Sequence, residues 1–196
     1  MRLIDTHSHL FLEEFSEDLP QVIERARSAG ITHIFMPNID STTIDSMLSV
    51  CNAYKDYCFP MIGLHPTSVN ADYEKELEIV ARELKSFNKY IAIGEIGMDL
   101  YWDKTFLKEQ QIALDKQINW ALEYDLPVVI HCRDAFDYIY NVLEPYKNTS
   151  LKGIFHSFTG TDDEAARILE FSGFLIGING VVTFKKSHLP EVLTKI

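Results

Sequence analysis

The sequence has no long apolar run, few cysteines and a shortage of basic residues. No stretch approaches the roughly 20 apolar residues of a transmembrane helix, and the N-terminus lacks the apolar core of a signal peptide. We therefore expect a cytoplasmic protein that does not associate with membranes. The three cysteines are an odd number at spacings that match no zinc module, which argues against a disulfide framework and favours reduced thiols.

The charge balance is strongly acidic, with 18 Lys and Arg against 29 Asp and Glu and a formal net charge of −11. Proteins that hold long nucleic acids do so by neutralising phosphates with many basic side chains. We therefore expect no stable complex with nucleic acid. A nuclease is still compatible with this charge, because bound divalent cations supply local positive charge inside an acidic body.

Short apolar, β-branched segments alternate with longer segments whose apolar residues recur every three or four positions. This alternation is typical of βα units and a parallel sheet, so the predicted fold class is α/β. We expect seven such units in a single domain over residues 1–196, which falls short of the roughly 250 residues of a closed eight-unit barrel. The expected strands are residues 3–7, 32–37, 59–64, 90–95, 127–131, 153–156 and 174–178, and the expected helices include residues 19–28, 74–86, 106–124 and 134–143.

The first expected strand leads into a His-x-His pair, His7 and His9. Residues two apart in a strand point to the same side, so both imidazoles can face one cation, with Asp5 below them. A strand histidine is also commonly a hydrogen-bonded core residue, and a chance pair is not rare among seven histidines. The pair alone leaves metal binding and a structural role equally open.

Polar residues also follow other expected strands. Glu95 follows a buried apolar run and lies between two glycines, an unusual place for a solvated carboxylate, while His131 and His156 each close an apolar strand. Since the carboxyl ends of barrel strands meet at one mouth, we expect these side chains to converge on a metal site. The alternative is a set of unrelated residues hydrogen-bonded to loops. The residues at or just past the strand ends are His7, His9, Asn38, His65, Glu95, His131, His156 and Asn179.

Five motifs in order resemble those of the TatD-like metal-dependent deoxyribonucleases, a family of the amidohydrolase superfamily. The resemblance covers essentially the whole chain, and five ordered motifs are far more specific than any one. The motifs are Ile4-Asp5-Thr6-His7-Ser8-His9, Gly63-Leu64-His65-Pro66, Gly94-Glu95-Ile96-Gly97-Met98-Asp99, His131-Cys132-Arg133-Asp134-Ala135 and Phe155-His156-Ser157-Phe158-Thr159-Gly160.

The resemblance implies a distorted TIM-type (β/α)8 barrel that holds two divalent cations. It places His7 and His9 on one cation and His131 and His156 on the other, with Glu95 bridging them. A hydroxide activated by both cations would then attack a phosphodiester, so the expected function is a deoxyribonuclease acting on DNA ends or on a small phosphoester. Imidazole-rich ligation favours zinc or another transition metal, and the carboxylate leaves manganese and magnesium open.

Further residues near these motifs each have a functional and a structural interpretation. The resemblance implies that His65 lies near the cations without being a principal ligand and can contact substrate phosphate, and a loop histidine stacked beside Pro66 is the structural alternative. Arg133 can reach a substrate phosphate with its planar fork, or pair with Asp99 or Asp134. Tyr101 and Trp102 either stack on a base or pack within their loop. Cys132 is expected to point away from the site, because strand alternation directs it to the opposite face. His33 and His188 are expected to be structural or solvated.

The chain departs from the family pattern at its C-terminal end. Family members continue into an eighth strand with an acidic segment of the form Glu-Thr-Asp-Ser/Ala-Pro, whose aspartate ligates the first cation. That segment does not occur in this sequence, so we expect a C-terminally truncated barrel with seven units and the eighth missing. The first and seventh strands would then have unpaired edges, and the first cation would lose a ligand.

Three functions remain to be distinguished. The leading hypothesis is a metal-dependent phosphodiesterase. The second is an amidohydrolase-type enzyme that cleaves a small amide or ester, although many such enzymes carry a carbamylated lysine where this chain has Glu95. The third is a truncated, weakly active barrel that binds metal or phosphate without turnover. The absent aspartate is the reason for considering it.

Overall fold

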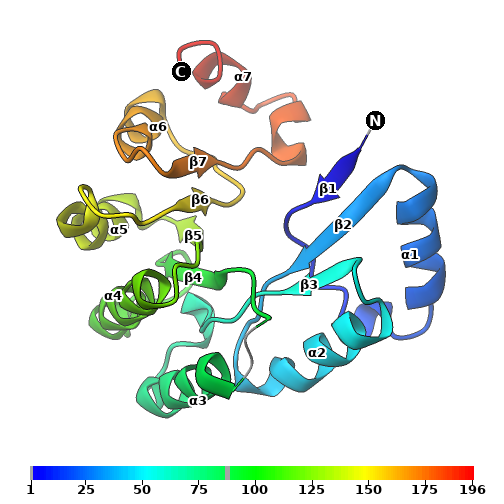
Figure 1. The fold of residues 1–196 in the computed structure, drawn as a ribbon. Helices are drawn as coiled ribbons and strands as arrows, with labels where there is room; N and C mark the ends of the chain where they lie inside the picture. Colours follow the sequence, from blue (N-terminus) through cyan, green and yellow to red (C-terminus); the bar gives the residue numbers. More distant parts are fainter. Residues whose placement is uncertain (1, 87–88) are drawn as a thin grey trace.

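The structure is a computed structural model that describes residues 2–86 and 89–196. All of its paired strands are parallel, as predicted for an α/β protein. In Figure 1 the strands follow one another around the middle of the molecule, and the helices lie outside them. The strands are β1 (Leu3–Asp5), β2 (Ile31–Met36), β3 (Cys58–Pro60), β4 (Ile93–Asp99), β5 (Val128–Arg133), β6 (Gly153–Phe155) and β7 (Phe174–Ile176).

The strands form two sheets in sequence order, β1-β2-β3 and β4-β5-β6-β7. A parallel bridge between Ile62 and Ile93 connects the first sheet to the second. At this bridge the Gly94 N–H donates to the carbonyl of Ile62 over 2.8 Å, and the Ile62 N–H donates to the carbonyl of Ala92 over 3.2 Å. The carboxyl ends of all the strands can therefore face a common region.

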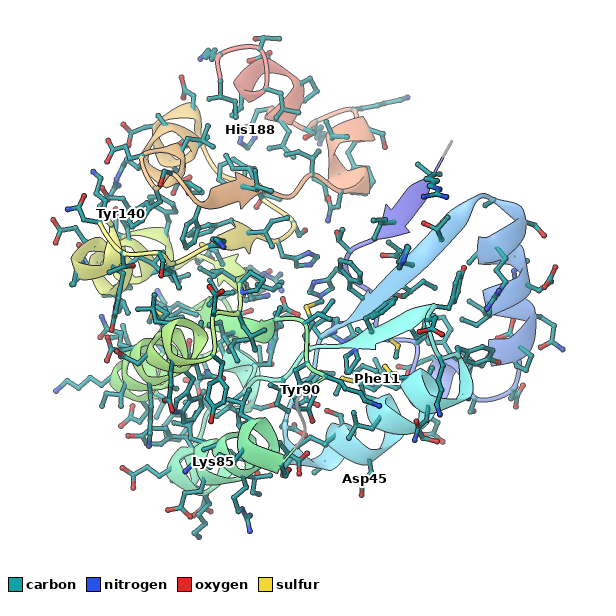
Figure 2. All side chains as sticks on the ribbon, in the orientation of Figure 1. Phe11, Asp45, Lys85, Tyr90, Tyr140 and His188 are labelled. Carbon is teal, nitrogen blue, oxygen red and sulfur yellow. The ribbon has the colours of Figure 1, made fainter. Side chains whose placement is uncertain are left out.

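Amphipathic helices cover the outer side of the sheets. Helix α4 buries Leu114 and Ile118 against the core, while α2 leaves Asp45 exposed on its outer side (Figure 2). This separation of apolar and polar faces is the physical reason that these segments form surface helices. The helices are α1 (Leu19–Ser28), α2 (Ile44–Ala53), α3 (Tyr73–Ser86), α4 (Leu107–Glu123), α5 (Phe136–Leu143), α6 (Asp162–Leu169) and α7 (Leu189–Val192), with short 3₁₀ turns η1 (Glu13–Phe15), η2 (Ser41–Thr43), η3 (Pro66–Ser68), η4 (Glu144–Tyr146) and η5 (Gly180–Thr183).

Strands β1 and β7 are the outer strands of the arrangement, each paired with one neighbour in the described part of the chain. Their apolar side chains are partly open to solvent: Leu3 is 38% exposed and Leu175 is 66% exposed. The expected unpaired edges are thus present within residues 2–86 and 89–196. Among the same residues, no helix combines the length and the apolar character needed to cross a membrane.

Two of the predicted strand boundaries are wrong in ways that affect the site. β1 ends at Asp5, so His7 and His9 lie in the segment after it and their common direction does not come from strand alternation. β4 runs from Ile93 to Asp99, which places Glu95 inside the strand. The strand continues past Glu95 because the pairing with β5 shifts register between Ile93 and Ile96, so the two glycines do not end it.

Candidate metal centre

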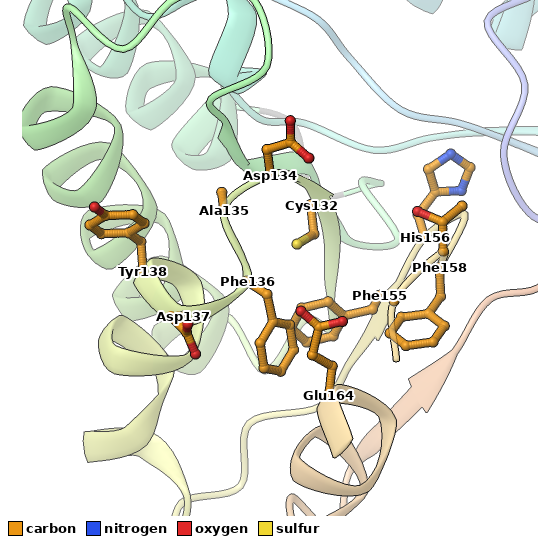
Figure 3. Close-up of a pocket in the computed structure, with 12 residues that line it drawn as sticks. Cys132, Asp134, Ala135, Phe136, Asp137, Tyr138, Phe155, His156, Phe158 and Glu164 are labelled. Carbon is orange, nitrogen blue, oxygen red and sulfur yellow. The ribbon is translucent and has the colours of Figure 1, made fainter. Parts of the chain in front are cut away.

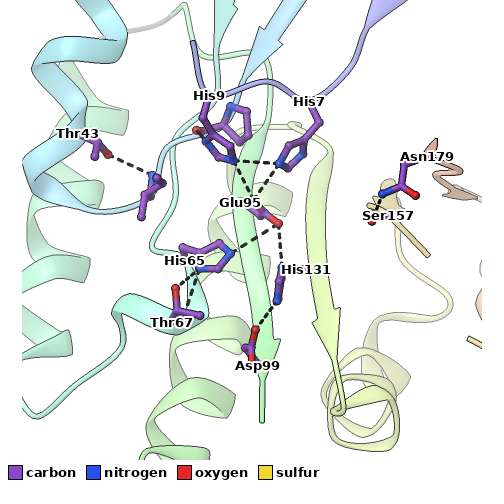
Figure 4. A network of polar contacts seen from close by, with 12 residues as sticks. His7, His9, Thr43, His65, Thr67, Glu95, Asp99, His131, Ser157 and Asn179 are labelled. Atoms are coloured by element: carbon purple, nitrogen blue, oxygen red, sulfur yellow. Dashed lines mark hydrogen bonds and ion pairs between the residues drawn. The ribbon is translucent and has the colours of Figure 1, made fainter. Parts of the chain in front are cut away.

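A buried carboxylate, Glu95, lies in β4, the first strand of the second sheet, and is surrounded by four imidazoles (Figure 4). Its side chain is 4% exposed, because every residue of β4 is buried. An ionised carboxylate at this depth is strongly unfavourable unless it is paired. The four imidazoles therefore account for the presence of a glutamate in an otherwise largely apolar strand.

Asn38, two residues after the end of β2, fixes the peptide bond between Gly94 and Glu95. Its N–H donates to the carbonyl of Gly94 over 3.1 Å, and its carbonyl accepts from the Glu95 N–H over 3.2 Å. The Asn38 side chain, fully buried, donates to the carbonyl of Gly63 and accepts from the Thr43 hydroxyl. Its position directly after a strand was the signal in the sequence, although its role as a support was not predicted.

The two oxygens of Glu95 divide the four imidazoles into two pairs. Oε2 lies 3.0 Å from Nε2 of His7 and 3.6 Å from Nε2 of His9. Oε1 lies 3.1 Å from Nδ1 of His131 and 3.7 Å from Nε2 of His65. One carboxylate thus connects two separate groups of ligand-type atoms.

The pKa values of these groups follow from their contacts. Burial by itself raises the pKa of Glu95, but hydrogen bonds from His131, His65, His7 and His9 outweigh it and hold the pKa well below its ordinary value. For His131, burial lowers the pKa, but the hydrogen bonds and negative charges of Glu95 and Asp99 outweigh burial, so that the pKa lies above its ordinary value. Glu95 is therefore an anion with full ligand capacity at neutral pH.

The residues fit divalent cations. In each of two groups, His7 with His9 and Glu95, and His65 with Glu95 and His131, the ligand-type atoms lie within 4.8 Å of one another. The Nδ1 atom of His7 is buried and has no hydrogen-bond partner among the described residues. Imidazole nitrogens and a shared carboxylate are donors that zinc and other transition metals accept readily.

Asp99 is a second buried carboxylate in β4 that the sequence did not assign to the centre. Its Oδ2 lies 2.9 Å from Nε2 of His131, on the other side of the ring from Glu95. Gln110 of α4 anchors the Asp99 backbone by accepting from its N–H and donating to its carbonyl. Its place four residues after Glu95 was a usable signal, since an even spacing along a strand directs both side chains to the same face of the sheet.

His156 lies outside both groups of ligand-type atoms. Its ring stacks on that of His7, with centroids 3.4 Å apart and planes 9° from parallel. Burial, assisted by the neighbouring His7, lowers the pKa of His156 to about 4, so the ring is neutral at neutral pH. His156 also borders a pocket at the carboxyl ends of β5 and β6, together with Cys132, Phe155 and Phe158 (Figure 3). Its role as a ligand of the second cation stays a prediction.

Arg133 does not form either of the ion pairs considered from the sequence. Within residues 2–86 and 89–196 it has no salt bridge to Asp99 or Asp134, and its guanidinium carbon lies 3.8 Å from the centroid of the Tyr101 ring. The same carbon is 5.6 Å from the centroid of the Trp102 ring. The guanidinium group of Arg133 thus contacts aromatic ring faces, which leaves its N–H groups available to hydrogen-bond an anion.

Four other residues considered from the sequence lie apart from the imidazoles that surround Glu95. Asp5 accepts a hydrogen bond from the backbone N–H of His7, so it supports the segment after β1. Cys132 packs against the core, His33 contacts Thr32 and Phe59, and His188 contacts the carbonyl of Gly160. The structural expectation for His33 and His188 is therefore confirmed.

The parallel α/β fold, with a carboxylate and four histidines at the carboxyl side of its strands, defines the chain as a metal-dependent hydrolase with a barrel-like fold. A family model described as TatD related DNase matches residues 4–196. The chain therefore belongs to the TatD-related DNase family, which confirms the resemblance found in the motifs.

The relatives agree with this assignment. The chain is 34% identical over 193 residues to a protein named uncharacterized metal-dependent hydrolase YabD from Bacillus subtilis, covering 98% of this chain and 74% of that protein. It is 31% identical to the 3'-5' ssDNA/RNA exonuclease TatD of Pantoea ananatis, covering 92% of this chain and 68% of that protein. The crystal structure of YjjV, a TatD homolog from Escherichia coli, superposes with a TM-score of 0.91 at 31% identity, covering all of this chain and 75% of that one.

Proposed function

We propose that this chain is a phosphodiesterase that removes nucleotides from the ends of single-stranded nucleic acid. The observation that carries the proposal is the division of Glu95 between two imidazole pairs, His7 with His9 and His65 with His131. The name of the Pantoea relative, an exonuclease on single-stranded DNA and RNA with 3'-5' polarity, supports the same substrate class and direction.

In this proposal the two groups of ligand-type atoms hold two divalent cations. His7 and His9 contribute to one group, His65 and His131 to the other, and Glu95 belongs to both. Divalent cations bound there would stabilise negative charge on phosphoryl oxygens and make water a better nucleophile at neutral pH. The histidine-rich donor set favours zinc or another transition metal, and the carboxylate leaves manganese and magnesium as further candidates.

The protein's own residues would prepare this chemistry in three ways. The depth of Glu95 in β4 keeps its carboxylate in one place, and the hydrogen bonds of Asn38 fix the peptide that carries it. Asp99 orients the ring of His131 through its Nε2, which leaves Nδ1 directed at Glu95. The site therefore requires little rearrangement to bind its ions.

The test uses a 5'-labelled single-stranded oligonucleotide and the full chain, stripped of metal by a chelator and reloaded with manganese, magnesium or zinc. We expect progressive shortening from the 3' end that depends on added metal and is lost in Glu95→Gln. Glu123→Gln, an exposed acid at the end of α4, is the matched control and should cleave like the native chain.

Parallel reactions with simple amides and carboxylic esters address the alternative functions. Turnover of an amide or ester without cleavage of DNA or RNA would overturn the phosphodiesterase proposal in favour of an amidohydrolase-type activity. Metal binding without turnover of any substrate would overturn it in favour of a binding protein. Cleavage of DNA that persists in Glu95→Gln would contradict the assignment of the centre.

A further inference from the structure

Two large aromatic side chains project into solvent directly after β4. Tyr101 is 50% exposed and Trp102 is 76% exposed. Their rings meet edge to face, with centroids 4.6 Å apart and planes at 89°. Exposed tryptophan is unusual on a protein surface, and a cluster of exposed aromatics is a common mark of a binding surface.

Arg133 completes this cluster. Its guanidinium carbon lies over the Tyr101 ring at 3.8 Å, with no carboxylate paired to it among the described residues. Stacking uses the face of the guanidinium and leaves its in-plane N–H donors for an anion, which they bind in a fork geometry suited to phosphate. In a chain with a net charge of −11, such an uncompensated cation beside aromatics stands out.

A short series of hydrogen bonds connects the cluster to the metal centre. The Tyr101 N–H donates to Oδ1 of Asp99 over 3.1 Å, and Oδ2 of Asp99 lies 2.9 Å from His131. The backbone of Arg133 in β5 lies opposite that of Asp99 in β4, and the Arg133 carbonyl accepts from the N–H of Leu100 over 2.9 Å. The cluster is therefore held next to the centre by the strands that carry Asp99 and His131.

We propose that Trp102, Tyr101 and Arg133 form a binding platform for single-stranded nucleic acid, in which a base stacks on Trp102 and Arg133 binds an adjacent phosphate. The proposal rests on the proposed function and specifies how the substrate is held. Every base has an aromatic face, so the platform accepts different sequences, whereas bases stacked inside a duplex cannot use it. DNA and RNA share this chemistry.

The first experiment measures binding to the metal-loaded full chain, with fluorescent phosphorothioate oligothymidylate chosen to slow hydrolysis. We expect Trp102→Ala to raise the dissociation constant about tenfold, the effect of losing one stacked base. Phe184→Ala is the matched control, because Phe184 is also an exposed aromatic, at 64%, and should bind like the native chain. Arg133→Lys, which keeps the charge but loses the planar fork, should weaken binding less than Arg133→Ala.

A second comparison uses an oligonucleotide of the same length with abasic positions next to the 3' end. Removal of the bases should weaken binding to the native chain about as much as Trp102→Ala does, and should have little further effect on Trp102→Ala. Oligothymidylate and oligouridylate arms show whether the platform distinguishes DNA from RNA.

The outcomes separate this inference from the proposed function. Equal binding of oligothymidylate by the native chain and Trp102→Ala, or fully additive effects of the variant and base removal, would overturn the platform even if the chain cleaves DNA. Conversely, coupled losses of binding in a chain that hydrolyses no nucleic acid would support the platform and refute the phosphodiesterase. A thermal unfolding curve of Trp102→Ala that matches that of the native chain shows that the weaker binding of this variant does not come from a loss of folding.

Discussion

Strands β4 and β7 belong to the same sheet, but their surroundings differ. All residues of β4 are buried, including Glu95 and Asp99, whereas in β7 only Phe174 is buried and Leu175 is 66% exposed. The two carboxylates of the centre thus lie on β4, the strand whose two faces are both buried. The buried negative charge of Glu95 is tolerated only because imidazoles surround it. The burial of this side chain and its contacts with the histidines therefore depend on each other.

The largest effect is expected from Glu95→Gln, which keeps the shape of the side chain but removes its charge. Both groups of ligand-type atoms lose their shared donor, so metal content should fall and hydrolysis should drop about a thousandfold or more, corresponding to several kcal/mol of lost charge stabilisation. Elemental analysis and initial rates measure both. Full metal content together with native rates would refute the role of Glu95.

Gly97 in β4 and Gly180 in the exposed turn η5 compare a buried strand with the turn after β7 through the same substitution. A Cβ on Gly97, which has a φ of +135°, would lie 2.0 Å from the carbonyl oxygen of His131, whereas a Cβ on Gly180 meets nothing within 4 Å. Gly97→Ala should lower the free energy of unfolding by about 3–5 kcal/mol, from strain and overlap together. Gly180→Ala should change it by less than about 0.5 kcal/mol in urea unfolding. Equal losses of unfolding free energy in Gly97→Ala and Gly180→Ala would show that β4 is packed no more tightly than the turn after β7.

Asp99→Asn tests the second carboxylate of β4. The amide keeps the volume but is a weaker partner for His131, so metal affinity and kcat/KM should fall about tenfold to a hundredfold while the fold is retained. Asp45→Asn on the exposed side of α2 is the control. If Asp99→Asn matched the native chain in both measurements, Asp99 would be a structural residue with no part in orienting His131.

The smallest effect is expected at the edge, from Leu175→Ala in β7. Because the side chain is 66% exposed, its truncation should change the free energy of unfolding by about 0.5 kcal/mol or less. Urea unfolding measures the change. A loss above about 2 kcal/mol would indicate that this side chain is covered in solution, and the contrast between β4 and β7 would disappear.

Much of the architecture was predictable from local patterns. The alternation of apolar strands with amphipathic helices predicted the parallel α/β arrangement, and four of the five histidine and glutamate residues assigned to metal from their positions meet around one point, namely His7, His9, Glu95 and His131. Strand boundaries were less predictable, since the strand expected over residues 90–95 is β4 at Ile93–Asp99, where a register shift in the pairing with β5 lets the strand continue. Backbone irregularities of this kind depend on the neighbouring strand.

The sequence by itself determined the order of the elements and the residue types available at their ends, because hydrophobic periodicity and motif spacing are local properties. Only the tertiary structure decided that Oε2 of Glu95 faces His7 and His9 and that Oε1 faces His131 and His65. It also placed His156 against His7 and Asp99 behind His131. These choices depend on ring orientations and distances between strands far apart in the chain, and packing of the whole sheet sets them.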